Sequence, residues 1–534
     1  MHPGNGSRFA ARRSLAGIAL ALFALEARAS DWYVDGVSGS NSNAGTAPGS
    51  AWKTITHAFA STPQAGRVTI HVLPGTYSPA AGELLPLDVR PQMKILGVAG
   101  SAATTIDGGG SAILVFQSYV SGNGWAIGPD TELRGFTLRN GAVGISMATN
   151  WNPVGPTLAE LVITGMNTVG IAMTTSYNPP AAPRITAVLS NVRCVGNGVG
   201  IQAVGRVSLS ADACEVSDNV GRGIFVSSGD SAPLSLRRSR LERNGSEGIG
   251  CTVYNYGSVQ VLLEDCLVAG NGEEGLDAAV PNGLGPSVSF TLRRSTVAHN
   301  GGAGVRLTKD PGCGSNCGGS LLLESSILHG NLGDVVTNAP LAASFCEIGD
   351  GTLAGLNGNF AADPSFVDVP AGDFRLAWGS PCIESGDPAT PAGALDLAGN
   401  ARPIDGDLDT AEAPDIGAYE HAPLFLASGA HIGTTLELEV WGPQGAPSVV
   451  YFARALPLAS PISTPYGSLM LDPMKTGIFR STSAGSGPPT QIVRTIPPSP
   501  TLIGLPFSFQ ALTDSPAAPQ GKAYTNAVGL VLQP

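Results

Sequence analysis

The chain has 534 residues, a formal net charge of −12 and only 13% charged residues. An acidic chain of this kind is a poor candidate for binding nucleic acid or anionic lipid, so we expect neither as a partner. Its length allows two or three domains.

Residues 1–29 have the three parts of a secretory signal peptide. Three arginines precede an apolar run over residues 15–25, and the A-R-A triplet ending at Ala29 is a small-residue cleavage pattern. The run is too short to anchor the mature chain in a bilayer, and no second run of spanning length follows. We therefore expect cleavage near Ala29, secretion to the cell exterior and no membrane insertion.

Residues 31–116 contain Y-V-D, N-A-G-T, W-K-T-I and then V-L-P-G-T-Y. This order of motifs resembles the N-terminal part of secreted pectate-lyase-like right-handed β-helix proteins. The resemblance implies a short helix, here over residues 50–60, that caps the open end of the β-helix. The loop with Asp35, Asn41 and Asn43 either binds calcium or is a plain turn, and its single carboxylate favours the turn.

Residues 117–206 repeat a strand–turn–strand pattern, and loops recur after its last strand. These loops and the corresponding ones of residues 207–336 carry Trp151, Tyr177, Tyr254 and Tyr256 along one predicted edge. Aromatic faces stack on sugar rings, so we predict that the four residues bind substrate. Alternatively, they cover the apolar underside of their own loops.

Residues 207–336 consist of five copies of a repeat of about twenty-seven residues. The copies align on Asn219, Asn244, Asn271, Asn300 and Asn331. Each copy holds three short segments of period two, too short for helices, and no copy can bury its own apolar row. Stacked copies with three strands per coil predict a right-handed parallel β-helix, in which the asparagines form a ladder and tolerate left-handed backbone.

Charges at one position of the repeat change sign with every copy. They are Asp212, Arg237 with Arg238, Glu264 with Asp265, Arg293 with Arg294, and Glu324. At the strand spacing of about 4.8 Å, each acid would face a base in the next coil. We interpret these residues as a structural ladder that fixes the register.

A second charged set lies beside the loop edge and consists of Glu247, Glu274, Asp277, Arg306 and Lys309. Lyases of β-helix folds resemble one another in holding calcium with acids near a basic residue that abstracts a proton. This resemblance implies Glu247, Asp277, Arg306 and Lys309 as catalytic candidates. An ordinary cross-coil ion pair between Asp277 and Arg306 is the favoured alternative. The galacturonan-hydrolase motifs N-T-D, G-H-G and R-I-K do not occur in the sequence.

Cysteines and histidines give further expectations. Cys313 and Cys317 share one loop and are the best disulfide pair, whereas Cys214 and Cys266 lie two coils apart, too far to bond. Pairing of Cys346 with Cys382 stays open. His299 and His329 flank the turn asparagines of adjacent coils, which favours a solvated turn over a metal site.

Residues 359–420 contain D-P-S-F, F-R-L, G-N-A-R and D-I-G-A-Y-E. They resemble the closing tail of secreted β-helix proteins whose members carry varied surface anchors. Asp405, Asp407 and Asp409 alternate here, and such carboxylates suit calcium, the one cofactor that we consider. A surface acidic turn is the alternative.

Residues 422–534 alternate short apolar runs with Pro/Gly/Ser stretches, which predicts a small antiparallel β-sandwich. The predicted domains are the signal peptide (1–29), the capped β-helix with its closing segment (30–420) and the β-sandwich (421–534). We expect a monomer that binds or processes polysaccharide outside the cell, as a lyase of acidic glycans. The alternative is a non-catalytic module that engages cell-surface material and uses the β-helix as a rigid scaffold.

Overall fold

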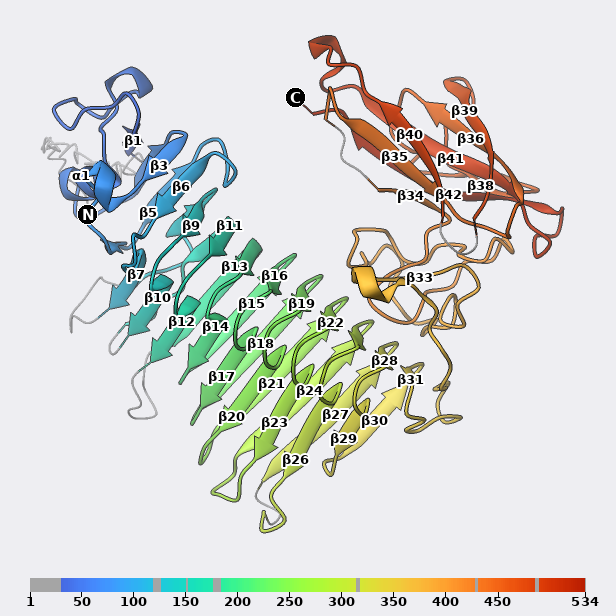
Figure 1. The fold of residues 1–534 in the computed structure, drawn as a ribbon, viewed down its shortest axis with the longest axis horizontal. Helices are drawn as coiled ribbons and strands as arrows, with labels where there is room; N and C mark the ends of the chain where they lie inside the picture. The colour runs from blue at the N-terminus through green and yellow to red at the C-terminus, as the bar shows by residue number, and fades with distance from the viewer. Residues whose placement is uncertain are drawn as a thin grey trace, which may run out of the picture.

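The computed structural model describes residues 30–118, 126–149, 152–175, 184–313, 317–427, 431–485 and 489–533. Up to Ile348 the chain winds as a parallel β-helix whose coils contribute three short strands each (Figure 1). This confirms the predicted architecture. Within the described ranges, no helix has the length and apolarity needed to cross a bilayer.

The first and second strands of the coils belong to one 21-stranded sheet. Its strands are β1 (Ser30–Val34), β2 (Val68–Val72), β3 (Gly75–Tyr77), β5 (Met93–Gly97), β6 (Thr104–Asp107), β8 (Glu132–Arg134), β9 (Thr137–Arg139), β11 (Thr157–Thr164), β13 (Ile185–Val195), β15 (Val207–Asp212), β16 (Glu215–Ser217), β18 (Ser231–Arg237), β19 (Arg240–Glu242), β21 (Ser258–Glu264), β22 (Leu267–Ala269), β24 (Ser287–Arg293), β25 (Thr296–Ala298), β27 (Gly318–Glu324), β28 (Ile327–His329), β30 (Leu341–Ser344) and β31 (Glu347–Ile348).

The third strands form a separate ten-stranded sheet. Its strands are β4 (Leu87–Asp88), β7 (Leu114–Ser118), β10 (Val143–Thr149), β12 (Val169–Thr175), β14 (Val199–Val204), β17 (Ile224–Ser228), β20 (Ile249–Val253), β23 (Leu276–Val280), β26 (Val305–Lys309) and β29 (Val335–Thr337).

Alternation along each strand fills the interior of the coil. In β21, Val259, Val261 and Leu263 are at most 2% exposed, while the residues between them face outward. Register places Val261 beside Phe290 of the next coil, so apolar rows of successive coils lie over one another. The stacking buries what a single coil could not bury.

The predicted asparagine ladder is present. Each Nδ2 donates to Oδ1 of the next asparagine at 2.8–2.9 Å, from Asn219 through to Asn331. The left-handed backbone expected at the asparagines falls instead on the preceding residue, for example Asp218 and Arg243. That residue makes the turn, because the amide itself has to point inward to reach its neighbours.

The charge ladder is confirmed as well. Ion pairs join Arg238 to Asp212, Arg237 to Glu264, Arg294 to both Glu264 and Asp265, and Arg293 to Glu324. Because most of these side chains are partly exposed, each pair contributes only about 0–1 kcal/mol and mainly fixes the register.

At the N-terminal end, α1 (Ile55–Ser61) buries Ile55 and Ala58 in the core of the coils (Figure 1). The helix is shorter than the predicted 50–60, because Pro48–Ser50 forms a separate 3-10 turn and Thr54 caps α1 by accepting from His57 N. In the preceding loop, Asp35 Oδ1 accepts two backbone N–H groups, the geometry of a plain turn.

We call residues 349–421 the closing segment; it contains the hairpin of β32 (Phe366–Asp368) and β33 (Asp373–Leu376). It packs on the outward side of the second strands (Figure 1) and buries Leu267 and Ala269 against Tyr419. One coil earlier the same outward positions hold Arg240 and Glu242. The change from charged to apolar residues marks where the segment docks.

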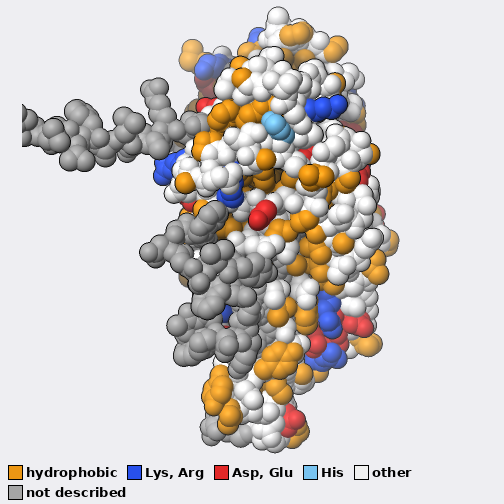
Figure 2. Space-filling view, turned by 90° about the vertical axis from the view of Figure 1, so that its left-hand side faces the viewer, with side chains coloured by type: hydrophobic (Ala, Val, Ile, Leu, Met, Phe, Trp, Pro, Cys, Tyr) orange, Lys and Arg blue, Asp and Glu red, His pale blue; other side chains and the backbone are white. Residues whose placement is uncertain are grey.

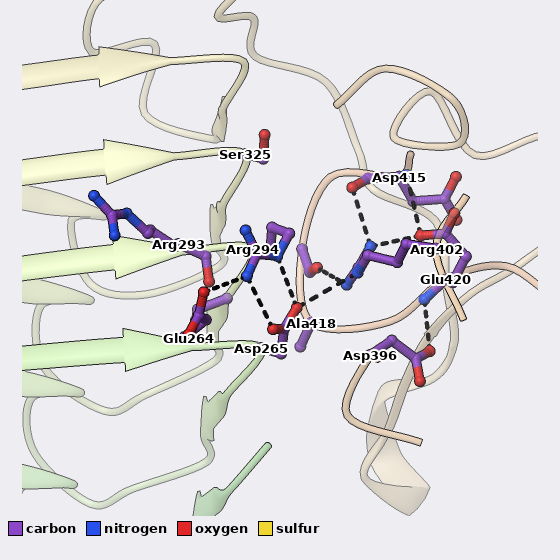
Figure 3. Close-up of polar contacts among 12 residues, drawn as sticks. Glu264, Asp265, Arg293, Arg294, Ser325, Asp396, Arg402, Asp415, Ala418 and Glu420 are labelled. Atoms are coloured by element: carbon purple, nitrogen blue, oxygen red, sulfur yellow. Dashed lines mark hydrogen bonds and ion pairs between the residues drawn. The ribbon is translucent and has the colours of Figure 1, made fainter. Parts of the chain in front are cut away.

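Buried charges hold the closing segment on the coils (Figure 3). Arg402, almost wholly buried, donates to Glu420 at 2.5 Å and to the Gly417 carbonyl, and its Nε lies 3.4 Å from Asp265. Asp265 also pairs with Arg294 of the charge ladder. The charge ladder is thus joined to the closing segment at Asp265.

The C-terminal residues form antiparallel sheets, as predicted. One sheet contains β34 (Leu424–Leu426), β35 (Thr435–Val440) and β40 (Thr490–Thr495); the other contains β39 (Thr476–Ser483), β36 (Pro447–Ala453), β41 (Pro506–Asp514) and β42 (Lys522–Val531); β37 (Ile462–Thr464) pairs with β38 (Gly467–Leu469). Leu438, Val450 and Phe509 share their core. Leu408 of the closing segment packs on Ala523, which joins the two parts.

The cysteines agree with the sequence analysis where it made a choice. Cys313 and Cys317 form a disulfide with Cα atoms 5.7 Å apart. Cys214 and Cys266 are buried free thiols, and so are Cys346 and Cys382.

Candidate functional site

Four strands of the ten-stranded sheet carry mostly small side chains on their outward side, with a few larger ones among them. We call the outward side of β17, β20, β23 and β26 the third-strand face. Its residues are Phe225, Ser227, Gly250, Thr252, Asp277, Ala279, Arg306 and Thr308. Charged groups line it at the asparagine turns, and aromatic loops follow the opposite ends of the strands.

The predicted charged residues meet on this face in ion pairs. Arg306 contacts Asp277 and Glu274, both at 2.7 Å. Glu247, only 4% exposed, accepts two hydrogen bonds from Arg222 at 2.7 and 3.1 Å. The structure therefore shows the cross-coil pair that the sequence analysis favoured over a catalytic role.

The electrostatics of the two arginines oppose a role as proton acceptor. Hydrogen bonding to Asp277 raises the pKa of Arg306, and hydrogen bonding to Glu247 raises the pKa of Arg222. A catalytic base needs a lowered pKa. Burial raises the pKa of Glu274, which weakens it as a calcium ligand.

Lys309 does not join the others. It ends β26, three residues beyond Arg306, where strand alternation puts it on the opposite side. Its aliphatic stem lies over Gly319 of β27. The structure brings together Glu247, Asp277 and Arg306, but not Lys309.

Two predicted aromatic residues project from the loop after β20. Tyr254 is 56% and Tyr256 68% exposed, and Leu284 of the next loop is 56% exposed beside them. Tyr254 leans back over the face, where its hydroxyl accepts from Ser227 Oγ at 3.4 Å. Trp151 and Tyr177 lie outside the described residues.

The backbone holds Tyr256 in an unusual conformation. Its φ is 63°, in the left-handed region that aromatic residues rarely adopt. Its N–H donates to the Leu284 carbonyl at 3.1 Å, which ties the two loops together. An exposed aromatic side chain is thus presented by a fixed turn at an energetic cost.

Figure 2 shows the molecule from the side on which the third strands lie in Figure 1. A mixed group of basic and acidic side chains lies low on that side, with hydrophobic side chains beside it.

Sequence reasoning missed Arg222. It lies three residues after Asn219, the same offset that Glu247 and Glu274 have from their asparagines, so the repeat could have revealed it. Its guanidinium lies 4.9 Å from the centroid of Phe225 and covers that ring.

A separate group of carboxylates lies in the closing segment. Glu384, Asp405 and Asp407 have ligand oxygens within 4.8 Å of one another. Burial, then the neighbouring carboxylates, raise the pKa of Glu384 and of Asp405 to about 7. Asp409 is not in the group; its carboxylate accepts from Ala411 N. Glu384 was not predicted, because it lies far from the others in the sequence.

Two family profiles match parts of the chain. Residues 37–226 match a family described as a protein of unknown function (DUF1565), and residues 169–339 match the right handed beta helix region. No curated protein matches the sequence.

Several solved structures are similar in fold. The A-module of the Azotobacter vinelandii mannuronan C-5 epimerase AlgE6 is 15% identical with a TM-score of 0.33, over 58% of this chain and 94% of that one. The GH136 lacto-N-biosidase from Eubacterium ramulus is 10% identical with a TM-score of 0.23, over 55% and 67%. The enzymatically active domain of bacteriophage CBA120 tailspike protein 2 is 12% identical with a TM-score of 0.26, over 90% and 74%.

Similarities this weak carry no information on substrate or chemistry. The parallel coils and the matched region agree in one respect, namely that residues 169–339 lie in a right-handed β-helix.

Proposed function

We propose that this protein is exported and binds polysaccharide, without cleaving it, along the third-strand face and its loop edge. The observation that carries the proposal is the pair Tyr254 and Tyr256. Both residues are more than half exposed, and the left-handed backbone of Tyr256 and its cross-loop hydrogen bond hold the turn that presents them. Sugar rings bind to exposed aromatic faces with hydroxyl partners nearby, here Thr252.

The charges of the face favour a neutral glycan over the acidic one expected from the sequence. Arg222 and Arg306 are each paired with carboxylates, and Glu273 adds an exposed negative charge. An incoming uronate would have to break these pairs and would meet net negative charge. A neutral glycan needs neither step.

The same pairs disfavour the lyase hypothesis. An arginine that donates to buried or half-buried carboxylates keeps its proton, so elimination next to a uronate carboxylate has no base at Arg306. We expect no unsaturated product by ultraviolet absorbance from any uronate, with or without calcium. Product formation that is lost in Arg306→Lys would instead favour the lyase.

Export is the second part of the proposal. The signal-like residues 1–29 end where β1 begins at Ser30. Cleavage after Ala29 would leave the first strand at the start of the mature chain, paired with β2. N-terminal sequencing of protein from the medium of the native host should read S-D-W-Y-V; an uncleaved chain retained in the cell would contradict this part.

Calcium is proposed as a structural ion in the closing segment. Three convergent carboxylates match the oxygen ligands that calcium prefers, and bound cation would relieve the repulsion that raises their pKa values. The site is distant in sequence from the tyrosines and would support the closing segment rather than bind glycan.

The binding experiment uses the full mature chain and a panel of neutral and acidic polysaccharides in affinity electrophoresis. We expect retardation by a neutral polysaccharide and about tenfold weaker binding, roughly 1.4 kcal/mol, when Tyr254 is replaced by Ala. Tyr466→Ala is the matched control, because Tyr466 is also exposed but lies in the turn between β37 and β38 near the C-terminus.

Tyr256→Gly sharpens the test. Glycine removes left-handed strain of roughly 1 kcal/mol, so this variant should unfold no more easily than the parent while it binds more weakly. Equal retardation of the parent, both tyrosine variants and the control would contradict glycan binding at the third-strand face.

A further inference from the structure

The two C-terminal sheets share one core (Figure 1), and that core contains a cavity. The cavity has a volume of about 240 Å³ and is lined from β35 and β40 of one sheet and from all four strands of the other. Every described residue that lines it is apolar, except Arg494 and Thr495. An apolar cavity of about 150 Å³ is large enough to hold benzene, so this one has room for a small apolar ligand.

Three phenylalanines of the four-stranded sheet form one wall of the cavity. Phe479 packs edge-on against Phe452 and Phe509, with ring centroids 6.2 and 5.1 Å apart. Phe509 is buried, whereas Phe452 and Phe479 keep part of their surface exposed. Apolar side chains around unfilled space lack contacts on one side, and an apolar ligand would supply those contacts.

One charged residue lies on the inner side of the other sheet. Arg494 of β40 alternates with Ile492 and Ile496, which are both buried, and side chains two residues apart on a strand share one face. Its register partner on β35 is the buried Leu436. The guanidinium carbon lies 5.9 Å from the ring centroid of Phe479 in the opposite sheet. The charge therefore lies at the cavity.

Arg494 is not neutralised by the chain itself. Its Nη1 donates to the Val493 carbonyl at 3.0 Å, no carboxylate lines the cavity, and in the part of the chain that the structure describes Arg494 forms no ion pair. An inward charge on an edge strand such as β40 can instead serve to prevent pairing with another sheet. That role requires no ligand, so a binding experiment separates the two roles.

We propose that this cavity binds a free fatty acid of medium chain length, with its alkyl chain against the phenylalanines and its carboxylate on Arg494. A guanidinium can bind a carboxylate through two parallel hydrogen bonds. The apolar lining opposes entry of a sugar, whose hydroxyls would lose their hydrogen bonds to water. One cation and a small volume suit one short chain rather than a two-chain lipid. The inference is independent of glycan binding at the third-strand face.

The test is calorimetric titration of the full mature chain with sodium octanoate and, separately, with 1-octanol. We expect saturation at one octanoate per chain and about tenfold weaker binding of 1-octanol, which has the same chain without the charge. In Arg494→Met, octanoate should bind no more tightly than 1-octanol, and 1-octanol should bind as it does to the parent. Arg454→Met is the matched control, because Arg454 is an exposed arginine of the same sheets that does not line the cavity.

A second variant fills the cavity and leaves the charge in place. Leu502→Trp should weaken the binding of both ligands, and thermal unfolding shows whether this variant is folded. Equal affinity of the parent for the two ligands, or unchanged octanoate affinity in Arg494→Met, would overturn the proposal. Binding to phosphatidylglycerol vesicles without binding of octanoate would assign the cavity to membrane lipid instead. A dimer in sedimentation velocity that octanoate does not dissociate would assign it to a second copy of the chain.

Discussion

At the residue scale, the asparagine ladder is the most demanding feature of the coils. Asn271 is 2% exposed; its Nδ2 donates to Leu241 O and to Asn300 Oδ1, and its own Oδ1 accepts from Asn244. Each asparagine thereby satisfies polar groups of two other coils. A buried polar group that loses its partner costs far more than the bond itself contributes.

Asn271→Ala should therefore lower the free energy of unfolding by roughly 2–4 kcal/mol, since it leaves several buried donors and acceptors unpaired. Equilibrium denaturation in urea measures the change. Asn338→Ala is the control, because Asn338 makes comparable bonds to Lys309 at an exposed position where water can replace them. If both variants lost the same free energy of unfolding, the buried asparagine ladder would contribute no more to stability than an exposed asparagine.

The offsets of the repeat made these residues predictable, and they also explain what was missed. Arg222 occupies the offset already recognised for Glu247 and Glu274, but only the acidic residues at that offset were singled out. The left-handed residue could not be assigned to Asp218 rather than Asn219, because both types favour that conformation.

At the scale of elements, the closing segment is held by charge as well as by apolar contact. Arg402 bridges Glu420 of its own segment and Asp265 of a coil corner, and all three are almost completely buried (Figure 3). Removing one partner of such a group leaves uncompensated buried charge.

Arg402→Met should lower the free energy of unfolding by ~3–5 kcal/mol. It should also release the closing segment before the coils unfold. Limited proteolysis followed by mass spectrometry would then show early cuts within residues 349–421. Arg139→Met removes a partly exposed pair with Asp107 and should cost at most about 1 kcal/mol. Cuts that begin in the coils, or equal costs for both variants, would contradict this role.

Contacts between elements were the least predictable part. The sequence indicated calcium ligands at Asp405, Asp407 and Asp409 by local spacing, but the loop turns Asp409 away and brings in Glu384. Such a contact depends on how an irregular segment folds, and the sequence of that segment has no repeating pattern from which the fold could be predicted. The start of α1 was likewise set by the Thr54 cap rather than by the apolar pattern.

At the scale of the whole molecule, the raised carboxyl pKa values predict how stability depends on pH. Glu384 and Asp405 titrate near 7 in the folded chain and near 4 when unfolded, so between these values the folded state binds more protons. Stability should therefore rise as pH falls from 8 to 5.5 in the presence of EGTA.

Calcium should change that dependence. By binding the ionised carboxylates, it stabilises the folded state most at pH 8 and less at pH 5.5, where protons compete. Thermal unfolding of the parent and of Asp405→Asn, each with calcium and with EGTA, measures both effects. The prediction fails if the parent shows no calcium effect at pH 8 or if Asp405→Asn keeps the full response.

The β-helix as a whole was predictable because stacking repeats one local rule many times, whereas its ligand depends on a few side chains at one edge. The most direct measurement is hydrogen–deuterium exchange with a bound neutral oligosaccharide. We expect slowed exchange in residues 254–257 and 282–285 and no change in the C-terminal sheets. Protection confined to the C-terminal sheets or the closing segment would contradict glycan binding at the third-strand face.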